Sequence, residues 1–146
     1  MNVLLIDDDE DTTFLMDVLF KKSKLVESYV IENNGNKALE HLLTNPDYPD
    51  CIFVDLKMPD MNGFEFVQKY ELFFNKQNSK TQVFFLSSSA LQSDYEKAKS
   101  FQSVKEFITK PLNKNKLSNI RDSIKACWGS INNTCQHKKK IKRSSR

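Results

Sequence analysis

The sequence has few cysteines, few histidines and no long hydrophobic run, and each shortage excludes a class of protein. No apolar stretch approaches the ~20 residues that cross a bilayer, and Met1 leads into a predicted strand instead of a signal peptide. The three cysteines are odd in number and form no CxxC pair, which favours reduced thiols in the cytoplasm over a disulfide framework. His41 and His137 have no ligand-spaced partners, so no histidine metal site is expected.

The charge is divided unevenly along the chain. The 146 residues have a formal net charge of +3, but the last eighteen hold six Lys or Arg and no acid. Residues 1–128 therefore carry 16 basic against 19 acidic residues, a net charge of −3. Because no apolar periodicity continues from Gly129 onward, we predict one domain over 1–128 and a basic, disordered tail over 129–146. Such a tail attracts nucleic acid or acidic proteins weakly, but no recognition-helix motif accompanies it, so nucleic acid is not an expected partner.

Short apolar runs alternate with helical patterns along the predicted domain. Continuous runs at 3–6, 51–54 and 82–86 are typical of strands buried on both faces of a parallel sheet, and shorter strands are predicted at 29–31 and 104–108. In the segments between and after these strands, apolar residues recur at helical spacing. In the first helix the spaced apolar residues are Phe14, Leu15, Val18 and Leu19. Five strands alternating with five helices predict a doubly wound α/β fold.

Polar residues follow four of the strands at the point where each strand ends. Asp7 and Asp8 end the first strand, Asp55 the third, Ser87 the fourth and Lys110 the fifth. Parallel strands with right-handed crossovers bring these ends to one edge of the sheet. Three neighbouring carboxylates repel one another, and Mg²⁺, which takes oxygen ligands and keeps waters beside a phosphate, relieves the repulsion. A nearby hydroxyl and ammonium suit an anionic group attached to Asp55, which indicates phosphoryl chemistry.

Each of these residues also has a simpler explanation. Asp7 and Asp8 could be acids that favour the N-terminus of a helix, although they precede the helix. Lys110 could be a solvated lysine before a proline, and a neighbouring hydroxyl could take the part of Ser87. The set of residues, more than any one of them, favours the phosphoryl site.

As a set, these motifs resemble the receiver domain of bacterial two-component response regulators, in the single-domain form similar to chemotaxis regulators. The resemblance rests on Asp7-Asp8, Asp55-Leu56-Lys57-Met58-Pro59, Gly63 opening a helix, Ser87 and Lys110-Pro111. It covers residues 2 to about 127 in order. It implies a flavodoxin-like sheet with strand order 2-1-3-4-5 and a cis Lys110–Pro111 bond.

The resemblance also implies a role for each acid. Asp55 would accept a phosphoryl group from phosphohistidine on a sensor histidine kinase or a histidine phosphotransfer protein. Asp8, Asp55 and the backbone carbonyl of Lys57 would bind Mg²⁺, and Asp7 would help through water.

Three further residues would contact or sense the phosphoryl group. Ser87 would hydrogen-bond it and Lys110 would pair with it. Ser87 stands where the family more often has Thr, which keeps the hydroxyl. Phe107 stands where many members have a Tyr that moves inward on activation. We expect Ser87 and the Phe107 ring to be repositioned on phosphorylation, without a hydroxyl on the ring to hydrogen-bond.

The predicted function is therefore a phosphoacceptor switch that catalyses only its own phosphorylation and dephosphorylation. No output domain fits into 129–146, so the signal would pass to a downstream protein or a homodimer. The face expected to carry it is built by the helix at 91–98, the strand at 104–108 and the last helix.

Two other classes of function stay open at this stage. Aspartate-nucleophile phosphatases of the haloacid dehalogenase type also place Asp and Lys at strand ends, but they need a second Asp two residues after the nucleophile, where this chain has Lys57. A receiver-shaped binding module that is never phosphorylated is the other alternative.

Overall fold

The computed structural model describes residues 1–45, 47–74 and 80–129. The predicted tail lies outside the described residues, apart from Gly129. The chain divides into two compact units, residues 1–112 and 113–146, which we describe separately. Within the described segments no helix has the length and apolar character needed to span a bilayer.

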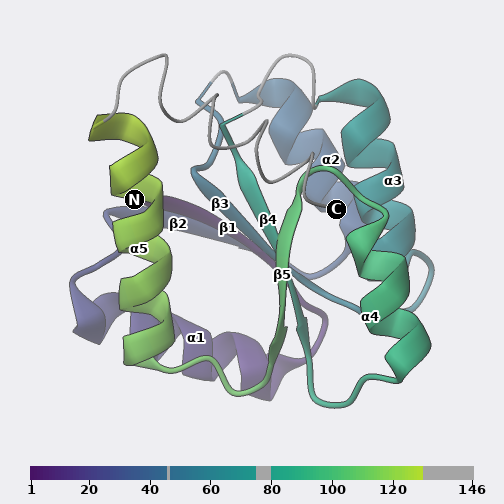
Figure 1. Ribbon diagram of the computed structural model, residues 1–146, viewed down its shortest axis with the longest axis horizontal. Helices are drawn as coiled ribbons and strands as arrows, with labels where there is room; N and C mark the ends of the chain where they lie inside the picture. Colours follow the sequence, from purple (N-terminus) through teal and green to yellow (C-terminus); the bar gives the residue numbers. More distant parts are fainter. Residues whose placement is uncertain (46, 75–79, 130–146) are drawn as a thin grey trace. The chain divides into compact units, whose positions relative to one another are not determined.

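A five-stranded parallel sheet forms the centre of residues 1–112 (Figure 1). Its strands run in the order β2-β1-β3-β4-β5, as predicted. The strands are β1 (Asn2–Ile6), β2 (Ser28–Glu32), β3 (Cys51–Asp55), β4 (Gln82–Ser87) and β5 (Val104–Thr109). Every residue of β3 and β4 is buried, which confirms them as interior strands, whereas β2 is at the edge and only partly buried.

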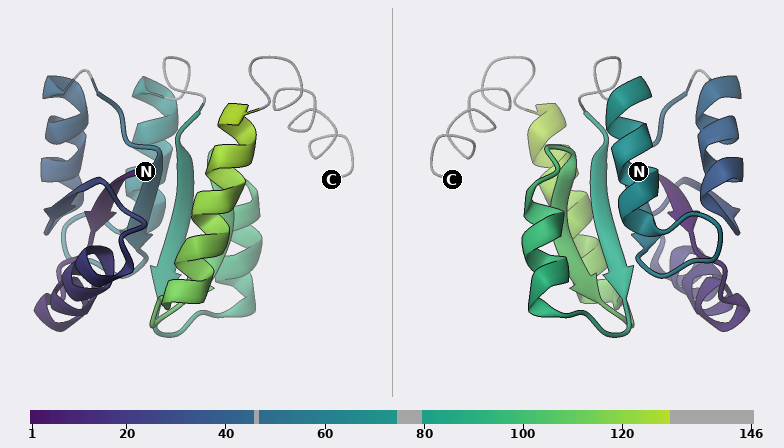
Figure 2. Two further views of the ribbon diagram at one scale, coloured as in Figure 1. Left: turned by 90° about the vertical axis from the view of Figure 1, so that its left-hand side faces the viewer. Right: turned by 90° about the vertical axis from the view of Figure 1, so that its right-hand side faces the viewer.

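Four helices cover the two faces of this sheet. They are α1 (Glu10–Ser23), α2 (Gly35–Thr44), α3 (Gly63–Phe73) and α4 (Gln92–Lys99). Helix α1 lies on one face, and α2, α3 and α4 form a layer on the other, which the right-hand view of Figure 2 looks onto. The second unit contributes α5 (Lys114–Gly129), whose stripe of Leu117, Ile120 and Ile124 recurs at helical spacing. Strands and helices therefore alternate along the chain as in the doubly wound α/β fold that the sequence predicts.

The core on the α2, α3 and α4 side of the sheet is largely aromatic. Phe85 of β4 contacts Phe64 of α3 edge to face, with ring centroids 5.1 Å apart, and Phe101 lies 6.4 Å from the Phe85 ring. Aromatic pairs in this geometry add about 0.5–1.5 kcal/mol each beyond the area they bury. This layer fixes α3 and α4 on the strands that end at the candidate site.

The orientation of α1 differs from the one its sequence suggests. Phe14 and Leu15 are 65% and 60% exposed, whereas Met16 and Phe20 are buried. Met16 and Phe20 are four residues apart and share one stripe, while Phe14 lies roughly 200° around the helix from Met16. The Phe20 ring stacks on Phe53 of β3 at 6.4 Å and so decides which side of α1 faces the sheet.

A tight turn links β3 to α3 immediately after Asp55. The Gly63 amide donates to the Leu56 carbonyl at 2.9 Å, and Asn62 caps α3 in a reciprocal capping box with Glu65. A Cβ on Gly63 would lie 2.6 Å from the backbone oxygen of Asp55 and 3.1 Å from the Leu56 Cα. Only glycine lets the start of α3 approach the end of β3 this closely.

This close approach predicts that Gly63→Ala destabilises the fold by about 1–3 kcal/mol, because the methyl group meets backbone that has no room to yield. Gly35→Ala is the matched control. Its Cβ would meet the flexible end of the Met61 side chain, at 2.5 Å from Sδ. Urea unfolding of both variants measures the difference. Equal losses of unfolding free energy would contradict the backbone explanation.

Candidate functional site

The register of the sheet brings the predicted site residues to its carboxyl edge. Ile6 pairs with Val54, so Asp7 follows β1 beside the last residue of β3, and Asp55 pairs with Leu86. The Lys110 amide donates to the Ser87 carbonyl at 2.9 Å, which holds the end of β5 against the end of β4. Four strands thereby deliver side chains to one place.

The Lys110 ammonium lies between two carboxylates. Its Nζ is 2.8 Å from Asp7 Oδ2 and 3.2 Å from Asp55 Oδ1. The Asp7 side chain is fully buried and the side chains of Asp55 and Lys110 are 10% and 15% exposed. The other Asp7 oxygen, Oδ1, accepts the Asp9 amide at 2.9 Å. Both Asp7 oxygens are thus engaged, while Asp55 pairs with Lys110 through Oδ1.

The electrostatics of the group set Asp55 apart from an ordinary aspartate. Burial raises the pKa of Asp55, the charge of Asp7 raises it further, and Lys110 offsets only part of this. Burial alone would lower the pKa of Lys110, but the hydrogen bond to Asp7 and the charges of Asp7 and Asp55 outweigh it and raise the Lys110 pKa. Lys110 therefore keeps its charge between the two acids, whereas burial and repulsion from Asp7 disfavour the charged form of Asp55.

Three carboxylates form a cluster that fits a divalent metal ion. Asp7, Asp8 and Asp55 each offer an oxygen, and these atoms lie within 4.8 Å of one another. With Lys110 the group carries a net charge of −2 when the acids are ionised. An all-oxygen donor set of this charge suits a hard cation such as Mg²⁺. The structure thus brings the three predicted acids together. Metal binding by the Lys57 backbone carbonyl stays a prediction.

Ser87 lies at the same edge with its hydroxyl engaged elsewhere. Its Oγ donates to the Ser89 carbonyl at 2.6 Å, and the residue is buried. The hydroxyl therefore makes its bond within the loop that follows β4. A hydroxyl has one hydrogen to donate, so contact with a group on Asp55 requires this bond to be exchanged.

Phe107 packs within the aromatic layer. Its ring centroid is 5.8 Å from Phe85 and 4.6 Å from Tyr95 of α4. The ring is partly buried against the core and connects β5, which Lys110 follows directly, with α4. Phe107 of β5 therefore contacts α4 directly, and its movement on phosphorylation stays a prediction.

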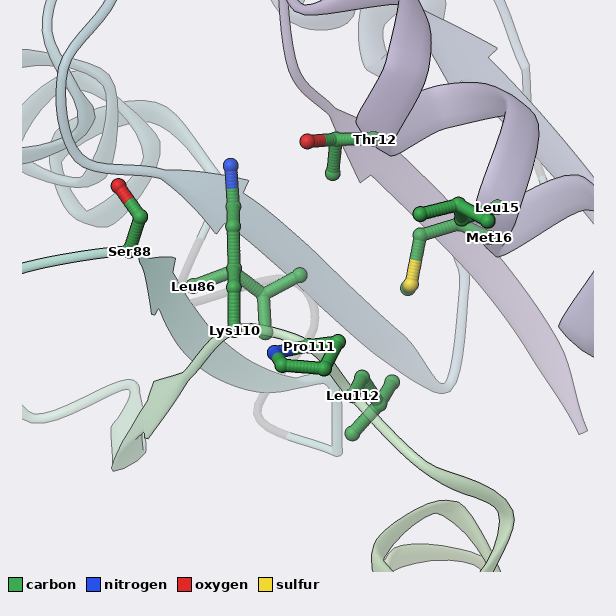
Figure 3. Close-up of a pocket in the computed structure, with 8 residues that line it drawn as sticks. All are labelled: Thr12, Leu15, Met16, Leu86, Ser88, Lys110, Pro111 and Leu112. Atoms are coloured by element: carbon green, nitrogen blue, oxygen red, sulfur yellow. The ribbon is translucent and has the colours of Figure 1, made fainter.

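A hollow that the sequence did not predict lies beside Lys110. Its walls include Thr12 and Leu15 of α1 and Ser88 after β4 (Figure 3). No motif reveals it, because the walls come from three separate segments. The one indication of the hollow is the exposed side chain of Leu15. That exposure can be recognised only once the orientation of α1 is known.

With this geometry described, comparison with known proteins decides the family. A family model described as the response regulator receiver domain matches residues 3–121. The chain belongs to this family. A search among curated proteins gave no match.

Solved structures resemble this receiver domain over most of its length. A two-component response regulator from Cytophaga hutchinsonii is 32% identical with a TM-score of 0.78, over 84% of this chain and 95% of that chain. A response regulator receiver protein from Dyadobacter fermentans is 30% identical with a TM-score of 0.74, over 86% of this chain and 96% of that chain. A two-component response regulator from Legionella pneumophila, 24% identical with a TM-score of 0.75 over 86% and 98% of the two chains, shares the fold. This receiver domain is accordingly a signalling module of two-component systems.

The raised pKa of Asp55 predicts that Asp55→Asn stabilises the metal-free receiver domain at neutral pH by a few degrees in Tm. A carboxyl group whose folded-state pKa is raised binds its proton more tightly in the folded chain, so wild-type stability falls as pH rises through that pKa. The gain in Tm of the variant over wild type should therefore grow from acid to neutral pH.

Thermal unfolding of both proteins in EDTA, across this pH range, measures the effect. Asp47→Asn, at an exposed position outside the cluster, is the control and should leave Tm unchanged. A lower Tm for Asp55→Asn at neutral pH would show that Asp55 stabilises the metal-free fold.

Proposed function

We propose that this receiver domain accepts a phosphoryl group on Asp55, from phosphohistidine on a sensor histidine kinase or a histidine phosphotransfer protein. The observation that carries the proposal is the shared Lys110 ammonium, 3.2 Å from an Asp55 oxygen inside an acidic cluster. One Asp55 oxygen attacks the phosphorus, and the bond from phosphorus to the imidazole nitrogen breaks. The imidazole leaves with the electron pair and takes a proton from water, and the Lys110 ammonium pairs with a negatively charged phosphoryl oxygen.

The acidic cluster would hold Mg²⁺ during this transfer. Asp8 and Asp55 would be direct ligands together with the Lys57 carbonyl, and Asp7 would act through water. When bound, the metal ion supplies charge neutralisation for the phosphoryl oxygens. Lys110 and the Asp9 amide already hold the Asp7 carboxylate in place. Asp7 is therefore better suited to a supporting role through water than to one that requires its side chain to move.

Ser87 would be the second group to contact the phosphoryl oxygens. The Ser87 hydroxyl would exchange the Ser89 carbonyl for a phosphoryl oxygen, and the loop after β4 would then lose one of its internal bonds. Phe107, in contact with Tyr95, would carry the change to α4. A downstream protein, or a second copy of the chain, would read the altered surface of α4 and β5.

Free phosphate esters are not the proposed substrates. Lys57 stands two residues after Asp55, where an aspartate-nucleophile phosphatase needs its acid and base. The protein would therefore catalyse only its own phosphorylation and dephosphorylation. Its location in the cytoplasm, beside a kinase, is part of the same proposal.

The first test is phosphorylation by a small donor. Incubation with acetyl phosphate and Mg²⁺ should add one phosphoryl group to the wild-type protein, measured by intact mass, with an adduct that is stable to acid and labile to base. Asp55→Asn should give no adduct, and EDTA should prevent the reaction. Asp47→Asn is the control and should react as wild type does.

Three results would contradict the proposal in different ways. An adduct that survives in Asp55→Asn would place the acceptor elsewhere. Rapid turnover of ordinary phosphate esters would identify a phosphatase. The absence of any adduct with Mg²⁺ present would favour a binding module that is never phosphorylated.

The second test follows the Phe107 ring. Phosphorylation should change the side-chain NMR shifts of Phe107 and Tyr95, because their rings are in contact and Lys110 follows Phe107 closely on the chain. Phe53, which packs towards α1 on the opposite face, is the internal control. If the Phe107 shifts are the same with and without the phosphoryl group, this ring takes no part in the switch.

A further inference from the structure

The two compact units of the chain carry opposite net charges. Residues 1–112 contain 12 basic residues against 18 acidic ones, a net charge of −6. Residues 113–146 contain 10 basic residues against a single acid, Asp122, a net charge of +9. A polyanion is therefore attracted to the second unit and repelled by the first.

Helix α5 begins the basic unit and ends beside an exposed indole. Leu117, Ile120 and Ile124 form the buried stripe of this helix. Trp128 lies four residues after Ile124 and so continues the stripe, yet 56% of it is exposed. Lys125, three residues before Trp128, is also exposed and is its neighbour on the helix surface. The last turn of α5 (yellow-green in Figure 1) therefore presents an aromatic ring and a cation together.

Most of the positive charge of this unit follows the indole. Six Lys or Arg lie within residues 138–146, and no acid follows Asp122. In α5 itself four basic residues outnumber Asp122, whose Oδ1 already pairs with Arg121 Nη2 at 3.3 Å. In the sequence, Trp128 thus stands between the basic residues of the helix and a denser basic cluster.

An anionic lipid surface matches these features better than a nucleic acid does. Clusters of four to eight Lys or Arg are attracted to anionic headgroups, and Trp is enriched at the boundary between lipid and water. Single-stranded nucleic acid is bound through several aromatic rings that stack on successive bases. Residues 113–146 contain no Phe or Tyr and a single Trp, which offers one stacking ring at most.

We propose that the end of α5 and residues 130–146 together bind the surface of membranes that contain anionic lipid. The basic residues contact lipid phosphates, and the Trp128 indole enters the interface between headgroups and acyl chains. Because the same surface repels the acidic residues 1–112, contact is confined to the second unit. This binding holds the receiver domain at the membrane reversibly and does not depend on phosphorylation of Asp55.

The test uses the fluorescence of Trp128, the only tryptophan of the chain. The full-length protein is mixed with vesicles of one part phosphatidylglycerol to two parts phosphatidylcholine, and separately with vesicles of phosphatidylcholine alone. The anionic vesicles should sediment the protein and shift the Trp128 emission to shorter wavelength, because the indole leaves water. The neutral vesicles should do neither. Salt at about 1 M should reverse the binding, since it shortens the Debye length to about 3 Å.

Matched charge variants locate the contact within the chain. Loss of three lysines from the basic cluster should weaken binding roughly a hundredfold, about fivefold for each lysine, in the triple variant Lys138→Gln, Lys139→Gln, Lys140→Gln. The control removes the same charge from exposed positions of the first unit and should bind within about twofold of wild type. It is the triple variant Lys22→Gln, Lys24→Gln, Lys37→Gln.

A second pair of variants tests the indole. Trp128→Ala should weaken sedimentation with anionic vesicles roughly tenfold, because the apolar area that the ring buries is lost. Phe73→Ala removes an aromatic side chain of similar exposure, 66%, from the acidic unit and should leave sedimentation unchanged. Thermal unfolding of each variant verifies that it is folded.

The outcomes distinguish a lipid surface from other partners. Sedimentation and an emission shift that both require anionic lipid, with losses confined to the variants of residues 113–146, support the inference. Binding to neither kind of vesicle, equal binding to both, equal losses in the control variants, or sedimentation without an emission shift would overturn it. A single-stranded oligonucleotide that binds more tightly than anionic vesicles at the same phosphate concentration, and quenches Trp128 without the shift, would identify nucleic acid as the partner instead.

Discussion

One ammonium group between two carboxylates is the interaction on which this site depends. Lys110 is bonded to Asp7, which is wholly buried, and is 3.2 Å from Asp55. Without a cation, a buried carboxylate such as Asp7 would be costly, because burial disfavours the charged form. Lys110 satisfies Asp7 and leaves Asp55 only partly neutralised. Burial and the charge of Asp7 together raise the pKa of Asp55.

The packing around the cluster keeps these groups in place. Backbone contacts hold the ends of the strands together, as the bond between the Lys110 amide and the Ser87 carbonyl illustrates. The β3–α3 turn approaches so closely at Gly63 that no side chain fits there. An aromatic layer then continues from Phe85 through Phe107 to Tyr95. The hydrogen bond from the Ser87 hydroxyl to the Ser89 carbonyl lies at this edge, and its exchange would suit a switch that responds to a local change of charge.

The α1 face adds a feature that the acids alone do not provide. The seating of Phe20 on Phe53 turns Leu15 outward, beside the hollow at Lys110. The same rotation exposes Phe14, which leaves two neighbouring apolar side chains on one helix with different surroundings. A contact in the core thus determines which side chains are available near the phosphoacceptor.

Much of the fold and the site could be predicted from the sequence because both follow from local patterns. The buried runs before Asp7, Asp55 and Ser87 identified the strands, and parallel strands must bring their carboxyl ends to one edge, so the meeting of Asp7, Asp55 and Lys110 followed. The sequence could not determine the side of α1 that faces the sheet, since Phe14, Leu15, Met16 and Phe20 offer competing apolar stripes. It also could not decide that the Ser87 hydroxyl bonds to Ser89, or that a pocket lies beside Lys110. Those features depend on contacts between residues far apart in the chain, and only the packed tertiary structure selects among them.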